Sequence, residues 1–249
     1  MDGGVAGAGM EEPFANDPHN TGHLNWDPDA MAPIVSNAIA NGWKVATHAV
    51  GDRSVRVLLD VYERALSENP GTPHATLVIE HAFLANAEQR ARAARMGVAI
   101  TVQHSLFYTN SADVLASWGE DRASKVMPVR SWLRNGAQVA AGTDSASPFD
   151  PMLNVGGFAT RETKDAGIQG PEEAIDVETA LELYTHAGAK LFGEATRLGA
   201  LEPGMRVRVP QQRAIDGLPF LLATEPGLDI AAYAREDVTA FDLATRAAR

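Results

Sequence analysis

The sequence predicts an α/β protein, a partial TIM-type (β/α) barrel of about the last four βα units, and three observations predict it. Short apolar segments alternate with amphipathic ones, the order expected of βαβ units with a parallel sheet. The apolar segments are nearly continuous runs, as strands buried on both faces are. His48 and His81, which end two of these segments, are 33 residues apart, and Asp144 follows after 63 more. Because one barrel unit takes roughly 30 residues, these ends lie one unit and then two units apart.

The first elements follow from turn residues and apolar spacing. Residues 1–30 are rich in Gly, Pro, Asn and Asp and are expected to form a loop, and a helix from Asp29 to Asn41 follows. Asp52 is expected to cap a helix over residues 53–67. The inward side chains of that helix are expected to be Val55, Leu58, Leu59 and Tyr62. The expected strands cover residues 43–48, 76–81, 98–104 and 138–144.

The later elements continue the alternation. A helix at about 86–96 follows the second strand, and a longer loop with one or two helices, ending near Asn135, follows the third. A helix-rich stretch from Val177 to Phe192 closes this region. We expect three parts: an N-terminal loop and helix at 1–42, the barrel segment at 43–200, and a divergent tail at 201–249.

The tail departs from the repeating pattern. A turn signal at Gly199–Gly204 precedes a basic segment, Arg206–Pro210, that breaks at a proline. This predicts an incomplete C-terminal β segment. Ala231–Arg249 is compatible with either a helix or a frayed end.

Composition excludes several classes of protein. The net charge of −11 and pI near 5.0 argue against binding to nucleic acid or to anionic membranes, because both need clustered Lys and Arg. No charge-free apolar run approaches the ~20 residues that span a bilayer, and the first residues do not resemble a signal peptide. We therefore expect a cytoplasmic protein. With no cysteine, any metal must be held by histidine, carboxylate or lysine-derived oxygen.

Polar residues end four of the apolar segments: His48, His81, His104 and Asp144. In β/α barrels the chemistry lies at the carboxyl ends of the strands. Imidazole and carboxylate groups that converge there can hold Zn²⁺ or a similar ion. Such an ion activates water and polarises a substrate carbonyl, and a nearby carboxylate can move the proton.

Each of these residues also has a structural interpretation. A single histidine after a strand is more often a hydrogen-bonded core residue than a ligand, and Asp144 in Gly-Thr-Asp-Ser could be only a turn or cap residue. The joint spacing of His48, His81 and Asp144 favours a site. His104 is expected to line the pocket without touching metal, and His23 to face a substrate.

Three motifs resemble the amidohydrolase superfamily, in its family-3 branch, which includes N-substituted formamide deformylases. They are Thr47-His48-Ala49-Val50-Gly51-Asp52-Arg53, Ile79-Glu80-His81-Ala82 and Ala141-Gly142-Thr143-Asp144. Asp2-Gly3-Gly4, Gly22–Trp26 and Leu198–Gly204 are also similar to that branch. The resemblance covers about residues 1–205. Its most specific part is the segment around His48.

The resemblance implies roles for the candidate residues. It implies that His48 and His81 bind a divalent metal, expected to be Zn²⁺, with one or two ions in a complete family member. Asp144 is similar to the aspartate that both binds metal and acts as general acid/base. His104 matches a substrate-pocket position. The implied reaction is hydrolysis of a non-peptide amide or formamide C–N bond by metal-activated water, so residues 43–200 would be the second half of a metal-dependent hydrolase barrel.

The sequence departs from the family pattern in its metal ligands. The branch has a His-x-His pair on its first strand and a lysine before Asp-Gly, and neither occurs here. We therefore expect four strands and three ligands to be missing. Three hypotheses stay open: a metal-dependent hydrolase of a small amide, a truncated and inactive remnant of one, or a module that pairs half-barrels into a homo-oligomer.

Overall fold

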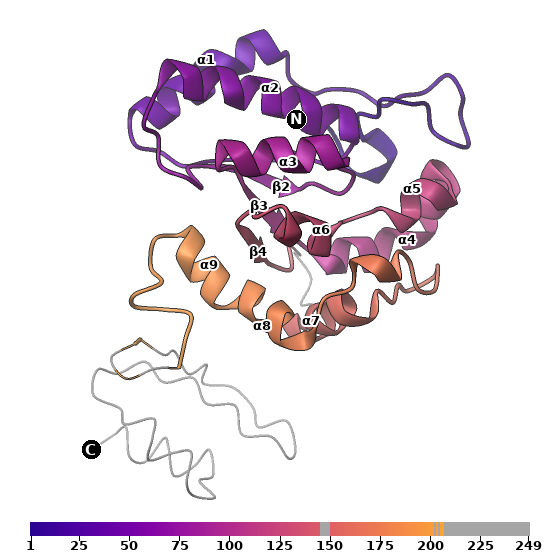
Figure 1. Ribbon diagram of the computed structural model, residues 1–249. Helices are drawn as coiled ribbons and strands as arrows, with labels where there is room; N and C mark the ends of the chain where they lie inside the picture. The colour runs from indigo at the N-terminus through magenta and orange to yellow at the C-terminus, as the bar shows by residue number, and fades with distance from the viewer. Residues whose placement is uncertain (145–149, 202, 204, 207–249) are drawn as a thin grey trace, which may run out of the picture. The chain divides into compact units, whose positions relative to one another are not determined.

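The computed structural model of the protein describes residues 1–144, 150–201, 203, 205 and 206 (Figure 1). The chain divides into two compact units, Met1–Tyr184 and Thr185–Arg249, and each is described by itself. Most of the second unit lies outside the described residues. Residues 207–249 are also outside the described part, so the β segment and the helix expected near the C-terminus lie outside the described residues.

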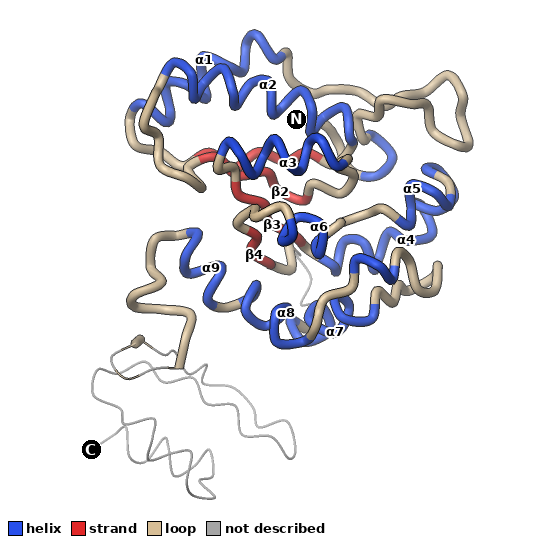
Figure 2. The backbone as a smooth tube through the Cα atoms, viewed as in Figure 1, coloured by secondary structure: helices blue, strands red, loops and turns tan. Residues whose placement is uncertain are grey.

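The first unit contains a four-stranded parallel sheet, which confirms the α/β class (Figure 2). The strand order β1-β2-β3-β4 follows the chain, so each strand pairs with the next. Ala49 pairs with His81, and Glu80 pairs with Thr101. The strands are β1 (Val45–Ala49), β2 (Leu77–His81), β3 (Ala99–Val102) and β4 (Val139–Ala141).

Helices connect the strands, and α1, α2 and α3 lie on one side of the sheet (Figure 1). The α-helices of the first unit are α1 (Pro28–Ala40), α2 (Asp52–Glu68), α3 (Ala87–Met96), α4 (His104–Trp118), α5 (Glu120–Ser124), α6 (Val129–Arg134), α7 (Pro151–Thr160) and α8 (Val177–Tyr184). Two short 3-10 helices cover Val5–Gly7 and Pro171–Glu173. In the second unit, α9 covers His186–Leu191, so the predicted helix-rich stretch is confirmed.

Local signals explain where several helices begin and end. The Asp27 side chain accepts the amide protons of Asp29 and Ala30 at the start of α1. Asn86 and Gln89 form a reciprocal capping box at the start of α3. That helix ends at Gly97, whose φ of 68° is left-handed and favours glycine.

The helix α2 packs its predicted face onto the sheet. Val55, Leu58, Leu59 and Tyr62 are all buried, as predicted. The Tyr62 hydroxyl lies 2.8 Å from the Val78 carbonyl, which can only accept, and 2.9 Å from the Thr47 hydroxyl. It therefore donates to Val78 and accepts from Thr47, which ties α2 to β1 and β2.

Two local predictions were wrong. The N-cap of α2 is Gly51, whose carbonyl accepts the amide proton of Val55, and Asp52 is the first helical residue. The Asp52 carboxylate accepts the amide protons of Glu11 and Arg53. No long loop follows β3, since α4 begins at His104. The buried side chains of α4 include Phe107, Ser111, Val114 and Trp118, a helical spacing that packs one face of this segment into the core.

Among the described residues, no helix combines the length and the apolar character that crossing a bilayer requires.

Candidate active site

The carboxyl ends of β1 and β2 bring His48 and His81 together. The strands are parallel neighbours, and His81 pairs with Ala49, the residue after His48. The two imidazole rings meet edge to face, with centroids 4.7 Å apart and planes at 74°. The predicted convergence of these two side chains therefore agrees with the geometry.

His81 lies between two further polar groups. Its Nδ1 is 2.7 Å from Oε1 of Gln103, and its Nε2 is 3.7 Å from Oδ2 of Asp144. The residue is 7% exposed, and burial lowers the pKa of its imidazole. The neighbouring His48 lowers this pKa as well, whereas the Gln103 hydrogen bond and the Asp144 carboxylate raise it. The φ angles of His81 and Ala82 are 76° and 43°, a left-handed backbone that is strained for both residues.

Asp144 follows β4 on a segment that side chains hold in place. Tyr184 donates its hydroxyl proton to the carbonyl of Gly142 at 2.8 Å, and Ser105 donates to the carbonyl of Thr143 at 2.5 Å. Asp144 has a φ of 43°, a conformation that aspartate tolerates better than most residues. Its side chain is 57% exposed, so its carboxylate faces solvent as well as His81.

His48 has a different environment from His81. Its side chain is 38% exposed, and its Nε2 lies 3.0 Å from the carbonyl oxygen of Gly3 and 3.4 Å from Oδ1 of Asp2. Because a carbonyl can only accept, Nε2 carries a proton in this arrangement. The lone pair of the neutral ring is then on Nδ1.

Asp2 supports the backbone that carries His48. Its side chain is fully buried, with 0% exposed. It accepts amide protons at 2.9–3.0 Å from Gly9, Val50 and Gly51. Val50 and Gly51 directly follow β1, so the Asp2 carboxylate determines the path of the chain just beyond His48.

Sequence reasoning missed two residues of this site, Asp2 and Gln103. In the sequence, Asp2 belongs to an Asp-Gly-Gly motif, and Gln103 lies within the expected strand over residues 98–104. An available signal was a polar residue at the end of the third strand, directly before His104. Asp2 had no comparable signal, because its partners lie seven to 49 residues away along the chain.

His104 is enclosed in the core of the first unit. It is 1% exposed, and its ring packs against the rings of Phe107 and Phe158 and against Gly157. Its Nε2 is buried and has no hydrogen-bond partner among the described residues. Burial, with a smaller contribution from the Arg161 cation, lowers the pKa of His104 to about 3.

This buried imidazole predicts acid sensitivity. The unfolded chain takes up a proton at His104 near pH 6.5, whereas the folded chain does so only near pH 3. The contribution of the neutral His104 ring to the unfolding free energy is therefore fully present above about pH 6.5. It falls by up to about 1.4 kcal/mol per pH unit as the pH drops toward 3. We expect His104→Gln to flatten this part of the curve of unfolding free energy against pH, measured by urea titration. The residual slope comes from other groups, including His81.

The matched control is His19→Gln, at an exposed position. Its curve should run parallel to that of the wild type. Equal slopes for His104→Gln and the wild type would contradict the assignment of a neutral buried imidazole.

His23 is exposed, and its ring lies against Gly7. The substrate-facing role of His23 stays a prediction.

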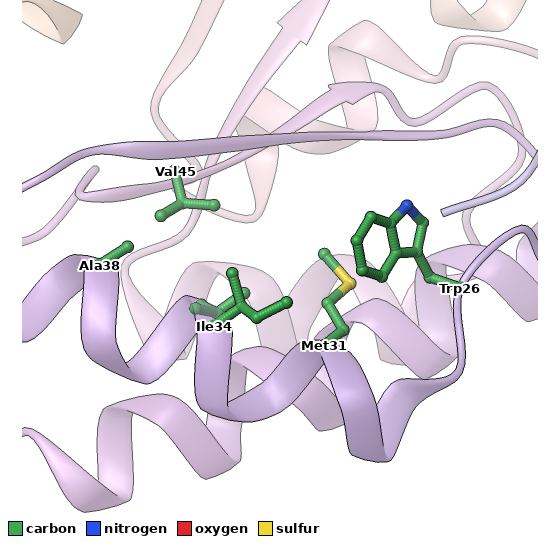
Figure 3. Close-up of a pocket in the computed structure, with 6 residues that line it drawn as sticks. Trp26, Met31, Ile34, Ala38 and Val45 are labelled. Atoms are coloured by element: carbon green, nitrogen blue, oxygen red, sulfur yellow. The ribbon is translucent and has the colours of Figure 1, made fainter.

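An apolar pocket lies at the other end of β1 (Figure 3). Trp26, Met31 and Ile34 face Val45, the first residue of the strand, and Val35 and Ala38 complete the lining. The lining holds no titratable group, so the pocket is separate from the histidine chemistry.

The described residues contain no group of three or more histidine, aspartate or glutamate side chains placed to hold a metal ion. Two imidazole–carboxylate pairs lie close together: His48 Nε2 is 3.4 Å from Asp2 Oδ1, and His81 Nε2 is 3.7 Å from Asp144 Oδ2.

The protein belongs to the amidohydrolase family, whose profile matches residues 1–206. It is 27% identical over 209 residues to YtcJ of Bacillus subtilis (strain 168), covering 82% of this chain and 39% of that protein. It is 29% identical over 171 residues to the N-substituted formamide deformylase of Arthrobacter pascens, covering 68% of this chain and 31% of that enzyme. The chain thus spans well under half the length of these relatives.

A solved structure gives a similar result. An uncharacterized metal-dependent hydrolase from Pyrococcus horikoshii OT3 superimposes with a TM-score of 0.71 at 30% identity. The match covers 82% of this chain and 41% of that one.

Proposed function

We propose that this chain carries part of the catalytic site of a metal-dependent hydrolase that cleaves the C–N bond of a small amide or formamide. The observation that carries the proposal is the position of His81, whose ring contacts His48 and whose Nε2 faces the Asp144 carboxylate. Family membership and the likeness to a metal-dependent hydrolase support it. The four parallel strands, in this proposal, are a segment of a (β/α) barrel.

The donor atoms of His81 and Asp144 suit a divalent ion such as Zn²⁺. Imidazole nitrogen and carboxylate oxygen bind Zn²⁺ at about 2.0–2.2 Å. Two atoms 3.7 Å apart are therefore close enough to share one ion. His48 would join them through Nδ1, the nitrogen that the hydrogen bond to Gly3 leaves free.

In this proposal the side chains have different roles in the reaction. A bound ion would polarise the substrate carbonyl and lower the pKa of water toward neutrality. The exposed carboxylate of Asp144 takes a proton from the attacking water as the C–O bond forms. It passes that proton to the nitrogen as the C–N bond breaks. His23, which is exposed, is a candidate substrate contact, whereas the enclosure of His104 favours a packing role.

The test measures zinc content and metal-dependent turnover of a panel of N-substituted formamides and simple amides by the full chain. We expect Asp144→Asn to lower kcat by about 100-fold or more, because it removes the proton carrier. The control Asp113→Asn, at an exposed position on α4, should keep wild-type turnover. Equal turnover by Asp144→Asn and the wild type would exclude the assigned role.

A second candidate is a chain without catalysis of its own. The observation that favours it is the lack of a three-ligand group among the residues that the structure describes. It predicts no metal-dependent turnover when Zn²⁺ is supplied in excess. If half-barrels pair, light scattering on the same sample should give the mass of a dimer.

A further inference from the structure

A partly buried set of polar side chains links the ends of β2 and β3. Glu80 and Thr101 are register partners on the two strands, and Gln103 follows β3 directly. The Thr101 hydroxyl donates to a carboxylate oxygen of Glu80. The Gln103 amide nitrogen lies 3.1 Å from the Thr101 hydroxyl and 3.5 Å from the same Glu80 oxygen.

These contacts determine which way the Gln103 amide faces. Both neighbours of its nitrogen act as acceptors, since the hydroxyl proton of Thr101 is already donated to Glu80. Turning the amide over would lose both bonds and place its oxygen against the Glu80 carboxylate. The Gln103 oxygen therefore faces His81, at 2.7 Å from Nδ1.

The orientation of Gln103 in turn determines where the His81 proton lies. A carbonyl oxygen can only accept, so Nδ1 of His81 carries the proton. The lone pair of the neutral ring is on Nε2, which faces the Asp144 carboxylate at 3.7 Å. Two acceptors then face each other, an arrangement that a cation between them would stabilise.

We propose that Gln103 is a positioning residue that holds His81 in the Nδ1–H tautomer and so presents its Nε2 lone pair toward Asp144. Glu80 and Thr101 act through Gln103 by holding its amide. The consequence for metal affinity rests on the proposed function. The tautomer itself does not, because it follows from hydrogen bonds within the chain.

Removing the side-chain amide of Gln103 should move the ring proton of His81 from Nδ1 to Nε2. In Gln103→Leu, Nδ1 loses its acceptor, and the proton shifts to Nε2, where it can be donated to Asp144. Thr101→Val should have an intermediate effect, because the amide then keeps only its long contact to Glu80. The matched control is Gln138→Leu, at the amino end of β4, away from His81.

The experiment records long-range ¹H–¹⁵N correlations of the full chain with ¹⁵N-labelled histidine, without metal, at pH 8. The His81 signals are assigned by their loss in His81→Asn. We expect the His81 cross-peaks to show the Nδ1–H tautomer in the wild type and in Gln138→Leu. In Gln103→Leu we expect them to show the Nε2–H tautomer. An Nε2–H or doubly protonated ring in the wild type, or an unchanged ring in Gln103→Leu, would overturn the proposal.

A second readout is Zn²⁺ affinity by competition with a chromophoric chelator. We expect Gln103→Leu to bind Zn²⁺ about 10- to 100-fold more weakly than the wild type, the usual effect of removing a partner of a ligating histidine. If the tautomers behave as expected but the wild type binds no Zn²⁺, the positioning role stands and the proposed function fails.

Discussion

Replacing Arg161 with methionine should destabilise the first unit by about 3–5 kcal/mol, as expected when a buried polar network loses its central group. Arg161 is fully buried and donates to the backbone carbonyls of Gln169, Met127 and Val126 at 3.0, 3.2 and 2.7 Å. Its guanidinium also lies 5.2 Å from the centre of the Phe107 ring. Burial lowers the pKa of Arg161 to about 10, which leaves it charged at neutral pH.

The physical reason is that methionine fills similar space but donates nothing. Two buried carbonyls and one partly buried carbonyl would then lose a charged donor, and an unsatisfied buried group costs about 1–3 kcal/mol. Guanidinium chloride unfolding followed by tryptophan fluorescence measures the change. All four tryptophans lie in the first unit, so the signal reports that unit.

Two further variants make the result interpretable. Arg161→Lys keeps the charge but cannot reach three carbonyls with one ammonium group, so an intermediate loss is expected. Arg134→Met, at an exposed position on α6, should change the unfolding free energy by no more than about 0.5 kcal/mol. If Arg161→Met and the wild type unfolded at the same denaturant midpoint, the hydrogen bonds of Arg161 would not contribute the stability assigned to them.

Replacing Asp2 with alanine should lower the unfolding free energy by about 3 kcal/mol or more. The side chain is fully buried, and it accepts three amide protons, from Gly9, Val50 and Gly51. Hydrogen bonds to charged groups contribute about 1.5–3 kcal/mol each, and alanine leaves all three amides without this acceptor. Since Val50 and Gly51 follow His48, the ring signals of His48 should shift as well.

The Asp2 prediction has its own controls. Asp2→Asn keeps one carbonyl oxygen but turns an NH₂ group toward amide donors, so we expect a loss between those of the alanine variant and the wild type. Asp17→Ala removes an exposed aspartate that also accepts a backbone amide, from His19, and should cost about 1 kcal/mol or less. Similar losses for Asp2→Ala and Asp17→Ala would show that the buried carboxylate contributes little.

Local signals in the sequence were sufficient for most of the secondary structure. The apolar runs predict all four strands, and the spacing of Val55, Leu58, Leu59 and Tyr62 predicts the buried face of α2. Such signals succeed because hydrophobic periodicity acts within one element. At Asp52 the prediction was wrong by one residue, since Gly51 is the N-cap of α2. The Asp52 carboxylate instead accepts the amide of Glu11, a contact between residues far apart in the chain.

By itself, the sequence determined the parallel α/β order of the chain and the positions of His48, His81 and Asp144 at strand ends, because both depend on patterns read along the chain. Only the tertiary structure decided that Gln103 orients His81, that the Gly3 carbonyl is hydrogen-bonded to Nε2 of His48, and that His104 is enclosed in the core. Each of these depends on which groups far apart in the chain meet in space. Hydrogen bonding and desolvation act over a few ångströms, so they become defined only when the strands and helices are packed together.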